Sequence, residues 1–253
     1  MTSFGYNVLG FGVNANPVVT ATPSIVSSGL ILHLDAGNTD SYSGSGTSWN
    51  NLISDDFDGT LTNGPTFSSD DGGSIVFDGS NDYVDFGSED LDPEADGLFA
   101  DSSHAWSASA WFKPSSSLTD RGVILGRGGV GNATHMTIFY DGRSSGDDLD
   151  VRVRGTKTTI NDTDITSTFS EVAVTWDGTT AKTYFNGSFV TNAGVGSKSE
   201  TSKVFTVGAG INNFGSPHKH FQGNIANIKI YEDELTAAEV LQNYNALKGR
   251  YGL

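Results

Sequence analysis

The sequence contains no cysteine, which excludes disulfide bonds, thiolate metal sites and cysteine nucleophiles. It also lacks lysine and arginine throughout its first 112 residues, which carry 16 of the 30 acidic side chains. The remaining residues hold 14 acidic and 14 basic side chains, so the formal net charge of −16 arises in the first part of the chain. A field of this sign repels nucleic acids and anionic membranes, and we expect neither as a partner.

Long apolar runs are absent as well. The residues directly after Met1 include no basic side chain and no apolar stretch of the kind found in signal peptides. No later apolar run is long enough to span a membrane. We therefore expect a chain without a signal peptide or membrane insertion, which is assembled inside a cell or released by lysis.

Glycine and phenylalanine are abundant, with 32 and 15 residues respectively. From Gly29 onward, short strand-like runs alternate with turn sequences such as Asp177-Gly178 and Asn186-Gly187. Many short strands joined by turns are typical of a β-sandwich or barrel. The sequence therefore predicts an all-β domain over residues 28–253.

One helix is predicted near the end of the chain. Thr236 and Glu239 have the spacing of a capping box, and Leu235 and Val240 that of a hydrophobic staple. The apolar stripe expected to face the sheets comprises Val240, Leu241, Tyr244 and Leu247. We expect this helix to dock on the sandwich.

Residues 1–27 carry no charge at all. Glycine and proline dilute the apolar side chains of this segment too strongly for it to form a helix or a core of its own. We predict an extended arm whose anchoring side chains are Phe4, Tyr6, Val8, Leu9 and Phe11. The arm either binds a partner, by adding a strand to a sheet edge, or folds back over its own domain.

Five blocks occur in a characteristic order and together carry a family resemblance. They are GLILHLDAGN (29–38), SIVFDGSNDYVDF (74–86), WSASAWFKP (106–114), FSEVAVTWDGTTAKTYFNGSFV (169–190) and FQGNIANIKIYEDELTAAEVLQNY (221–244). In this order they resemble the laminin G-like, concanavalin A-like lectin/glucanase jelly rolls. The resemblance implies two antiparallel sheets packed face to face, with adhesive, glycan-binding or structural roles.

Catalytic residues are not predicted. Related glycosidases carry Glu-x-Asp-x-x-Glu on a strand, so that two carboxylates flank the sugar bond, and no such run exists here. His218 and His220 lack a third metal ligand nearby. We expect a chain that is not an enzyme and requires no cofactor.

Calcium is the ion that the resemblance makes most plausible, since many members of the family bind it through loop carboxylates. The candidate ligands are Asp78, Asn81 and Asp82 in FDGSNDY, together with Asp120 after the WFKP strand. The same FDGSNDY residues also suit an Asx-type turn. A single weak calcium site and a plain turn both remain open at this stage.

Aromatic residues on loops or on the outward side of a strand are the usual platforms for sugars. Trp49, Trp111 and Phe214 are the candidates for a glycan or partner contact, whereas Trp106 and Trp176 have the phase of core residues. Trp49 also has the alternative of packing beneath its own loop.

The start SFGYNVLGFG, followed by a laminin G-like domain, resembles the layout of bacteriophage virion proteins. This resemblance implies a structural or adhesive module on the virion surface, as head decoration or fibre, assembled in the host cytoplasm. Its expected partners are other virion proteins, reached through the arm, further copies of the chain, and cell-surface glycans. A free glycan-binding lectin and an atypical glycoside hydrolase are the alternatives.

Overall fold

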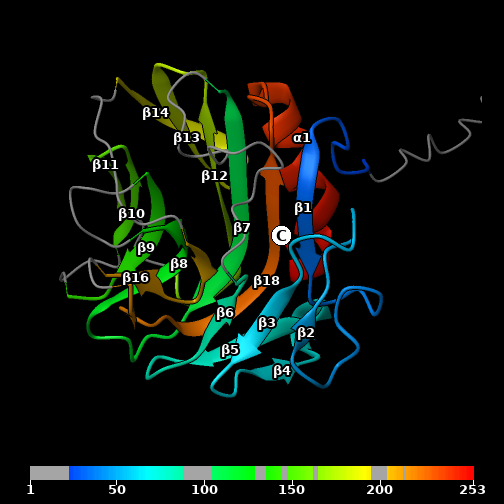
Figure 1. Cartoon of the computed structure of the whole chain (residues 1–253). Coiled ribbons are helices and arrows are strands. Elements are labelled where there is room, and N and C mark those ends of the chain that lie inside the picture. Colours follow the sequence, from blue (N-terminus) through cyan, green and yellow to red (C-terminus); the bar gives the residue numbers. More distant parts are fainter. Residues whose placement is uncertain are drawn as a thin grey trace, which may run out of the picture.

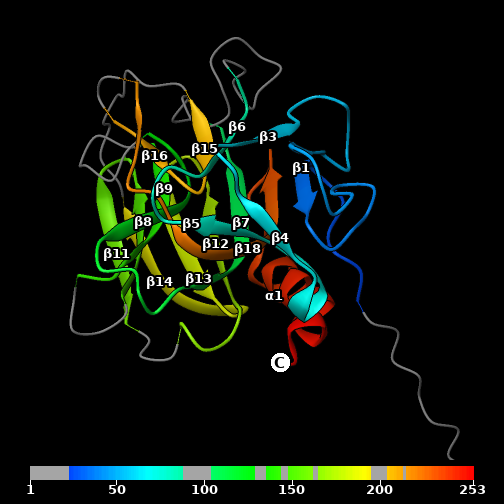
Figure 2. The same ribbon diagram turned by 90° about the horizontal axis from the view of Figure 1, so that it is seen from below.

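The computed structural model describes residues 23–87, 104–128, 135–143, 148–161, 165–194, 204–212 and 215–253. Two antiparallel sheets pack face to face, and one helix lies at the C-terminal end of the chain (Figures 1 and 2). This arrangement confirms the predicted sandwich with a short C-terminal helix.

The first sheet, called sheet A, has the order β14-β13-β12-β7-β18-β5-β4, and β1 pairs with β18 beside β5. Its strands are β1 (Leu30–Asp35), β4 (Thr66–Ser68), β5 (Ser74–Asp78), β7 (Trp106–Pro114), β12 (Ser170–Trp176), β13 (Thr180–Phe185), β14 (Ser188–Gly194) and β18 (Gln222–Tyr231). In Figure 1, β14 and β4 mark the two ends of this sheet.

The second sheet, sheet B, has the order β11-β10-β9-β8-β15-β6-β3-β2. Its strands are β2 (Ser48–Trp49), β3 (Gly59–Thr62), β6 (Tyr83–Asp85), β8 (Arg121–Arg127), β9 (Met136–Asp141), β10 (Asp148–Val153), β11 (Thr156–Asn161) and β15 (Phe205–Val207). A separate small hairpin consists of β16 (Gly210–Ile211) and β17 (Pro217–His218).

Side-chain alternation along the strands builds the core between the sheets. Val172, Val174 and Trp176 of β12 point into it, and Trp106 of β7 lies directly opposite Trp176 in the strand pairing. The inward positions predicted for Trp106 and Trp176 are confirmed, since each is 2% exposed.

Helix α1 (Ala237–Leu247) and the 3₁₀ turn η2 (Lys248–Tyr251) cover the outer face of sheet A (Figure 2). The capping box of Thr236 and Glu239 is present, and Val240 is buried on the sheet as expected. Leu241 is 45% exposed, so its place in the buried stripe was predicted wrongly. A second 3₁₀ turn, η1 (Asp70–Gly72), follows β4.

A buried ion pair lies on this covered face of sheet A. Glu171 and Lys229 approach to 3.7 Å, and their side chains are at most 1% exposed. Lys229 also donates a hydrogen bond of 2.8 Å to Asn227. Burial raises the pKa of Glu171 to about 7, against the opposing effect of the Lys229 charge.

The described chain begins beside α1. Gln242 donates to the carbonyl of Ser24 at 2.8 Å, and the backbone N–H of Val26 donates to the side chain of Asn243 at 2.8 Å. The end of the predicted arm therefore already packs on the domain. Phe4, Tyr6, Val8, Leu9 and Phe11 lie outside the described residues.

Candidate functional site

A cleft of about 310 Å³ opens on the outer face of sheet B. Its lining side chains come from β6, from β15 and from the β16–β17 hairpin, three segments that are far apart in the sequence. The residues that define it are Tyr83, Asp85, Thr206, Ile211, Gly215 and Pro217.

The floor of the cleft follows from the alternation along β6. Val84 is fully buried in the core, so its neighbours Tyr83 and Asp85 point to the opposite face of the sheet. In the strand pairing, Asp85 lies between Thr60 of β3 and Thr206 of β15. The floor is therefore a polar row of hydroxyl and carboxylate groups with a tyrosine ring beside it.

The β16–β17 hairpin forms a wall above this floor. The backbone N–H of Ile211 donates to the carbonyl of Gly128 at 3.1 Å, which ties the hairpin to the end of β8. Across the hairpin, the side chain of Asn212 accepts from the N–H of Ser216 at 3.0 Å. These bonds fix an apolar wall that Ile211 and Pro217 present to the cleft.

One carboxylate is found among the described lining residues, that of Asp85. Its Oδ1 accepts a hydrogen bond of 2.9 Å from the N–H of Gly87, which orients the group. An aromatic ring and an oriented carboxylate suit a ligand that has both apolar C–H faces and hydroxyl groups. The hydroxyl of Thr206, which is fully buried beneath them, donates to the carbonyl of Ala209.

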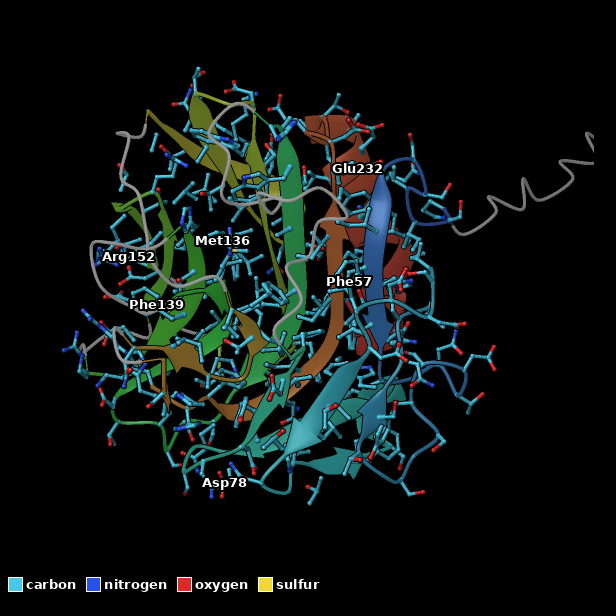
Figure 3. The ribbon with its side chains drawn as sticks, in the orientation of Figure 1. Phe57, Asp78, Met136, Phe139, Arg152 and Glu232 are labelled. Carbon is cyan, nitrogen blue, oxygen red and sulfur yellow. The ribbon has the colours of Figure 1, made fainter. Side chains whose placement is uncertain are left out.

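The other half of this sheet face is already filled by its own side chains. The guanidinium groups of Arg121 and Arg152 lie 5.3 and 5.8 Å from the ring centroid of Phe139 (Figure 3). Asp141 forms ion pairs with Arg121 and Arg143, whose cations hold the pKa of this carboxyl well below its usual range. The cleft is thus the open part of a face that is otherwise closed.

The aromatic platforms predicted from the sequence lie elsewhere. Trp49 and Trp111 are both 0% exposed, so the prediction that they contact a glycan directly is wrong. Trp111 does lie on the outward side of its strand, but Tyr244 and Tyr251 stack on it with ring centroids 5.5 and 4.5 Å away. Trp49 packs within the core between the sheets.

Phe214, the third predicted platform, lies outside the described residues. Its neighbour in the sequence, Gly215, lines the cleft.

The calcium candidates are engaged in a turn and in ion pairs. Asp78, at the surface end of β5 (Figure 3), accepts hydrogen bonds from the N–H groups of Ser80 at 2.7 Å and Asn81 at 3.4 Å. These bonds lower the pKa of Asp78, whereas burial raises the pKa of Asp82. The bond from Ser80 to the Asp78 side chain forms an Asx-type turn, and the side chain of Asp82 accepts in addition from the N–H of Asp78 at 3.0 Å.

Asp120 lies beside a cation. Its Oδ2 accepts from the ammonium group of Lys219 at 2.6 Å, and this bond is the main cause of its lowered pKa. In the described part of the chain no three His, Asp or Glu side chains are grouped so that they could hold a metal. The Asx-type turn that the sequence allowed is present and Asp120 is paired with a cation, while calcium binding by these residues stays a prediction.

Tyr83 and Asp85 were not singled out from the sequence as a site. The signal was present in DYVDF, where Val84 and Phe86 alternate with Tyr83 and Asp85 as in a half-buried strand. Periodicity alone shows that both side chains face outward. It does not show that the β16–β17 hairpin rises beside them.

The matched region of the sequence contains all the lining residues of the cleft. A family model described as "Concanavalin A-like lectin/glucanases superfamily" matches residues 78–241. The chain belongs to this superfamily. A search of curated proteins gives no match.

Solved structures with the same fold include large glycan-binding proteins. Trypanosoma rangeli sialidase in complex with sialic acid matches with a TM-score of 0.64 and 14% identity, over 92% of this chain and 36% of the sialidase chain. The binding domain of botulinum neurotoxin DC in complex with SialylT matches with a TM-score of 0.55 and 14% identity, over 87% and 52% of the two chains.

The binding domain of botulinum neurotoxin serotype D matches with a TM-score of 0.56 and 12% identity, over 85% of this chain and 51% of that domain. The present chain thus spans about a third of the sialidase and half of the toxin domains. At these identities the likeness concerns the fold.

Of the helices in the described ranges, none has the length and apolar character needed to cross a bilayer.

Proposed function

We propose that the chain is a non-enzymatic adhesive module that binds saccharides in the cleft on the outer face of sheet B. The observation that carries this proposal is the grouping of Tyr83, Asp85 and Thr206 in one open cleft of about 310 Å³. The superfamily membership supports it, because lectins share this sandwich.

Each lining group has a counterpart in a sugar ring. The half-buried ring of Tyr83 offers an apolar face on which the C–H groups of a pyranose stack. Asp85 Oδ2 accepts hydrogen bonds from sugar hydroxyls, since only Oδ1 is engaged by Gly87. Thr60, exposed next to Asp85 in the strand pairing, contributes a hydroxyl at the rim.

The absence of catalysis is part of the proposal. Hydrolysis of a glycosidic bond by the usual route needs two carboxyl groups about 5 to 9.5 Å apart across the bond. Within the described lining, Asp85 stands alone as a carboxyl group. The lack of a second carboxyl group among the described lining residues supports binding of a sugar without turnover.

The second part of the proposal concerns where the module acts. We place it on the surface of a bacteriophage particle, as head decoration or fibre, with the arm before residue 23 attached to a neighbouring subunit of the particle. The uncharged arm and the phage-like start SFGYNVLGFG support this assignment. Mass spectrometry and immunolabelling of purified particles test it, and absence of the chain from the particles would contradict it.

A glycan array tests the binding activity. We expect the wild-type protein to bind a subset of neutral or basic glycans, and the Tyr83→Ala variant to lose that binding. The Ile53→Ala variant serves as a matched control, because Ile53 is 47% exposed but does not line the cleft. An array without any bound glycan would contradict the proposed activity, and release of reducing ends from a bound glycan would contradict its non-enzymatic nature.

A further inference from the structure

Strand β14 (Ser188–Gly194) is a free sheet edge of unusual length for this molecule. It ends sheet A and pairs with β13 alone among the described strands. The strands at the other sheet ends are shorter, with three residues in β4, two in β2 and six in β11. The edge of β14 therefore offers the longest row of backbone groups to an incoming strand.

This edge lacks two of the usual protections, although its register against β13 shifts at Val190 as in a β-bulge. Its sequence, SFVTNAG, contains no charge and no proline, whereas natural edge strands commonly use both to prevent pairing. Phe189 and Val190 are 55% and 39% exposed. The edge strand β11, by contrast, carries a charged side chain, since Lys157 forms an ion pair of 3.0 Å with Asp150.

The edge is also held in place by the core. The ring of Phe189 packs edge-on against Tyr184 with centroids 5.6 Å apart, and Tyr184 is 3% exposed among the residues beneath α1. At the preceding turn, Asn186 and Gly187 have φ of 47° and 72°, as a tight hairpin requires. A strand arriving at β14 thus meets a preorganised edge.

The segment that best matches this edge is the N-terminal arm. Residues 1–22 precede the described fold, carry no charge, and alternate Phe4, Tyr6 and Val8 with Gly5 and Asn7. Fully extended, they reach roughly 70 Å at about 3.3 Å per residue. Two copies with a net charge of −16 repel each other, so contact is favoured where both surfaces are uncharged.

A neighbouring copy can receive the arm without the arm turning back over its own helix, and a monomeric wild type would indicate pairing with the chain's own β14 instead. Ser24 and Val26 are tied to α1 by Gln242 and Asn243. Three strands, β13, β12 and β7, separate β14 from β18, whose Tyr231 hydroxyl also binds Val26. The arm would have to turn back across the helix to reach its own edge.

We infer that β14 binds residues 1–22 of a second copy of this chain as an added strand, with Phe189 and Val190 forming the contact surface for the alternating apolar side chains of the arm. This inference rests on the anchoring role proposed for the arm and names its partner. It makes the protein a multi-copy assembly built by strand exchange between neighbours.

Sedimentation analysis of full-length variants tests the inference. One variant changes the edge (Val190→Lys), and one changes the arm (Phe4→Gly, Tyr6→Gly and Val8→Gly together). The control is Ile53→Lys, at an equally exposed apolar position away from the edge. We expect the wild type and the control to form oligomers, and both test variants to sediment as monomers with unchanged circular dichroism.

Mixing the two test variants provides the decisive comparison. The edge variant retains an intact arm and the arm variant an intact edge, so an equimolar mixture should form 1:1 dimers. A monomeric wild type, an unchanged mass of either variant, or a mixture that stays monomeric would overturn the inference. Glycan binding by the monomeric edge variant is the readout for the cleft, so failure of the assembly and failure of the proposed activity are distinguishable.

Discussion

Tyr83 and Asp85 show that the alternation along a strand predicts which way a single side chain points. Their outward orientation was readable from Val84 and Phe86, which are the core residues of the same stretch. Trp49 shows the converse, because a tryptophan in a Gly- and Ser-rich stretch left both a ligand contact and burial open, and the structure buries it fully in the core. Its burial depends on contacts with distant strands, which local sequence does not encode.

Asp85 is the residue whose charge should govern ligand choice. Asp85→Asn keeps the shape and removes the negative charge, so we expect about a tenfold loss of affinity, as for a hydrogen bond to a charged group worth ~1.5 kcal/mol. Calorimetric titration with a glycan found on the array measures this. Asp40→Asn, at an exposed carboxylate outside the cleft, is the control and should leave affinity unchanged.

The buried Glu171 gives a prediction about how the free energy of unfolding depends on pH. Because its pKa rises from 4.5 to about 7 on folding, the folded state binds its proton more tightly than the unfolded state does. This contribution to stability is fully present below pH 4.5 and is lost as pH rises toward 7. Burial of His33 lowers its pKa to about 4, so its contribution to stability rises with pH over much of the same range, and the decline due to Glu171 has to be measured by urea unfolding against a variant.

The matched variant for this prediction is Glu171→Gln, which has no titrating group at the same site. Its free energy of unfolding should lack the decline between pH 4.5 and 7 that Glu171 produces. If the free energies of unfolding of the two proteins changed in parallel with pH, Glu171 would not be the cause of the decline.

At the level of helices, strands and turns, short sequence motifs were sufficient to predict features whose contacts lie within a few residues. The capping box at Thr236 and the turn at Asn186-Gly187 were both identified from the sequence and are present in the structure. The pairing of β18 with β7, β5 and β1 joins segments more than a hundred residues apart. Such pairings depend on the whole chain, as does the cleft.

The capping box allows a quantitative test of the helix. Thr236 Oγ1 accepts from the N–H of Glu239 at 3.3 Å, and Glu239 accepts from the N–H of Thr236 at 2.8 Å. Thr236→Ala should destabilise the protein by about 1 kcal/mol, as expected for loss of an N-cap. Denaturant unfolding measures this loss, and Thr236→Ser should recover most of it.

At the scale of the whole molecule, the sequence predicted the sandwich because the order of the five blocks carries more information than any single one. It predicted that the C-terminal helix docks on the sandwich, but not that this segment covers Trp111. Trp111 was correctly placed on the outward side of β7, yet Tyr244 and Tyr251 from the C-terminal segment hide it. An outward position on a strand is exposed only if no other element packs over it.

Calcium dependence is another property of the whole molecule. Asp120 is paired with Lys219, and Asp78 and Asp82 bind backbone N–H groups, so folding should not need the ion. We expect the melting temperature to stay within a degree or two, a shift below about 0.5 kcal/mol in stability, when a chelator replaces calcium. A fall of tens of degrees would reveal a structural calcium site.

The central claim is that the cleft at Tyr83 binds a saccharide, and calorimetric titration of wild-type protein and Tyr83→Ala tests it most directly. For a glycan bound on the array, the account predicts saturable binding by the wild type and at least a tenfold weaker Kd for Tyr83→Ala, since stacking on an aromatic ring contributes about 1.5 kcal/mol. Equal affinities for the two proteins, with both folded, would contradict it.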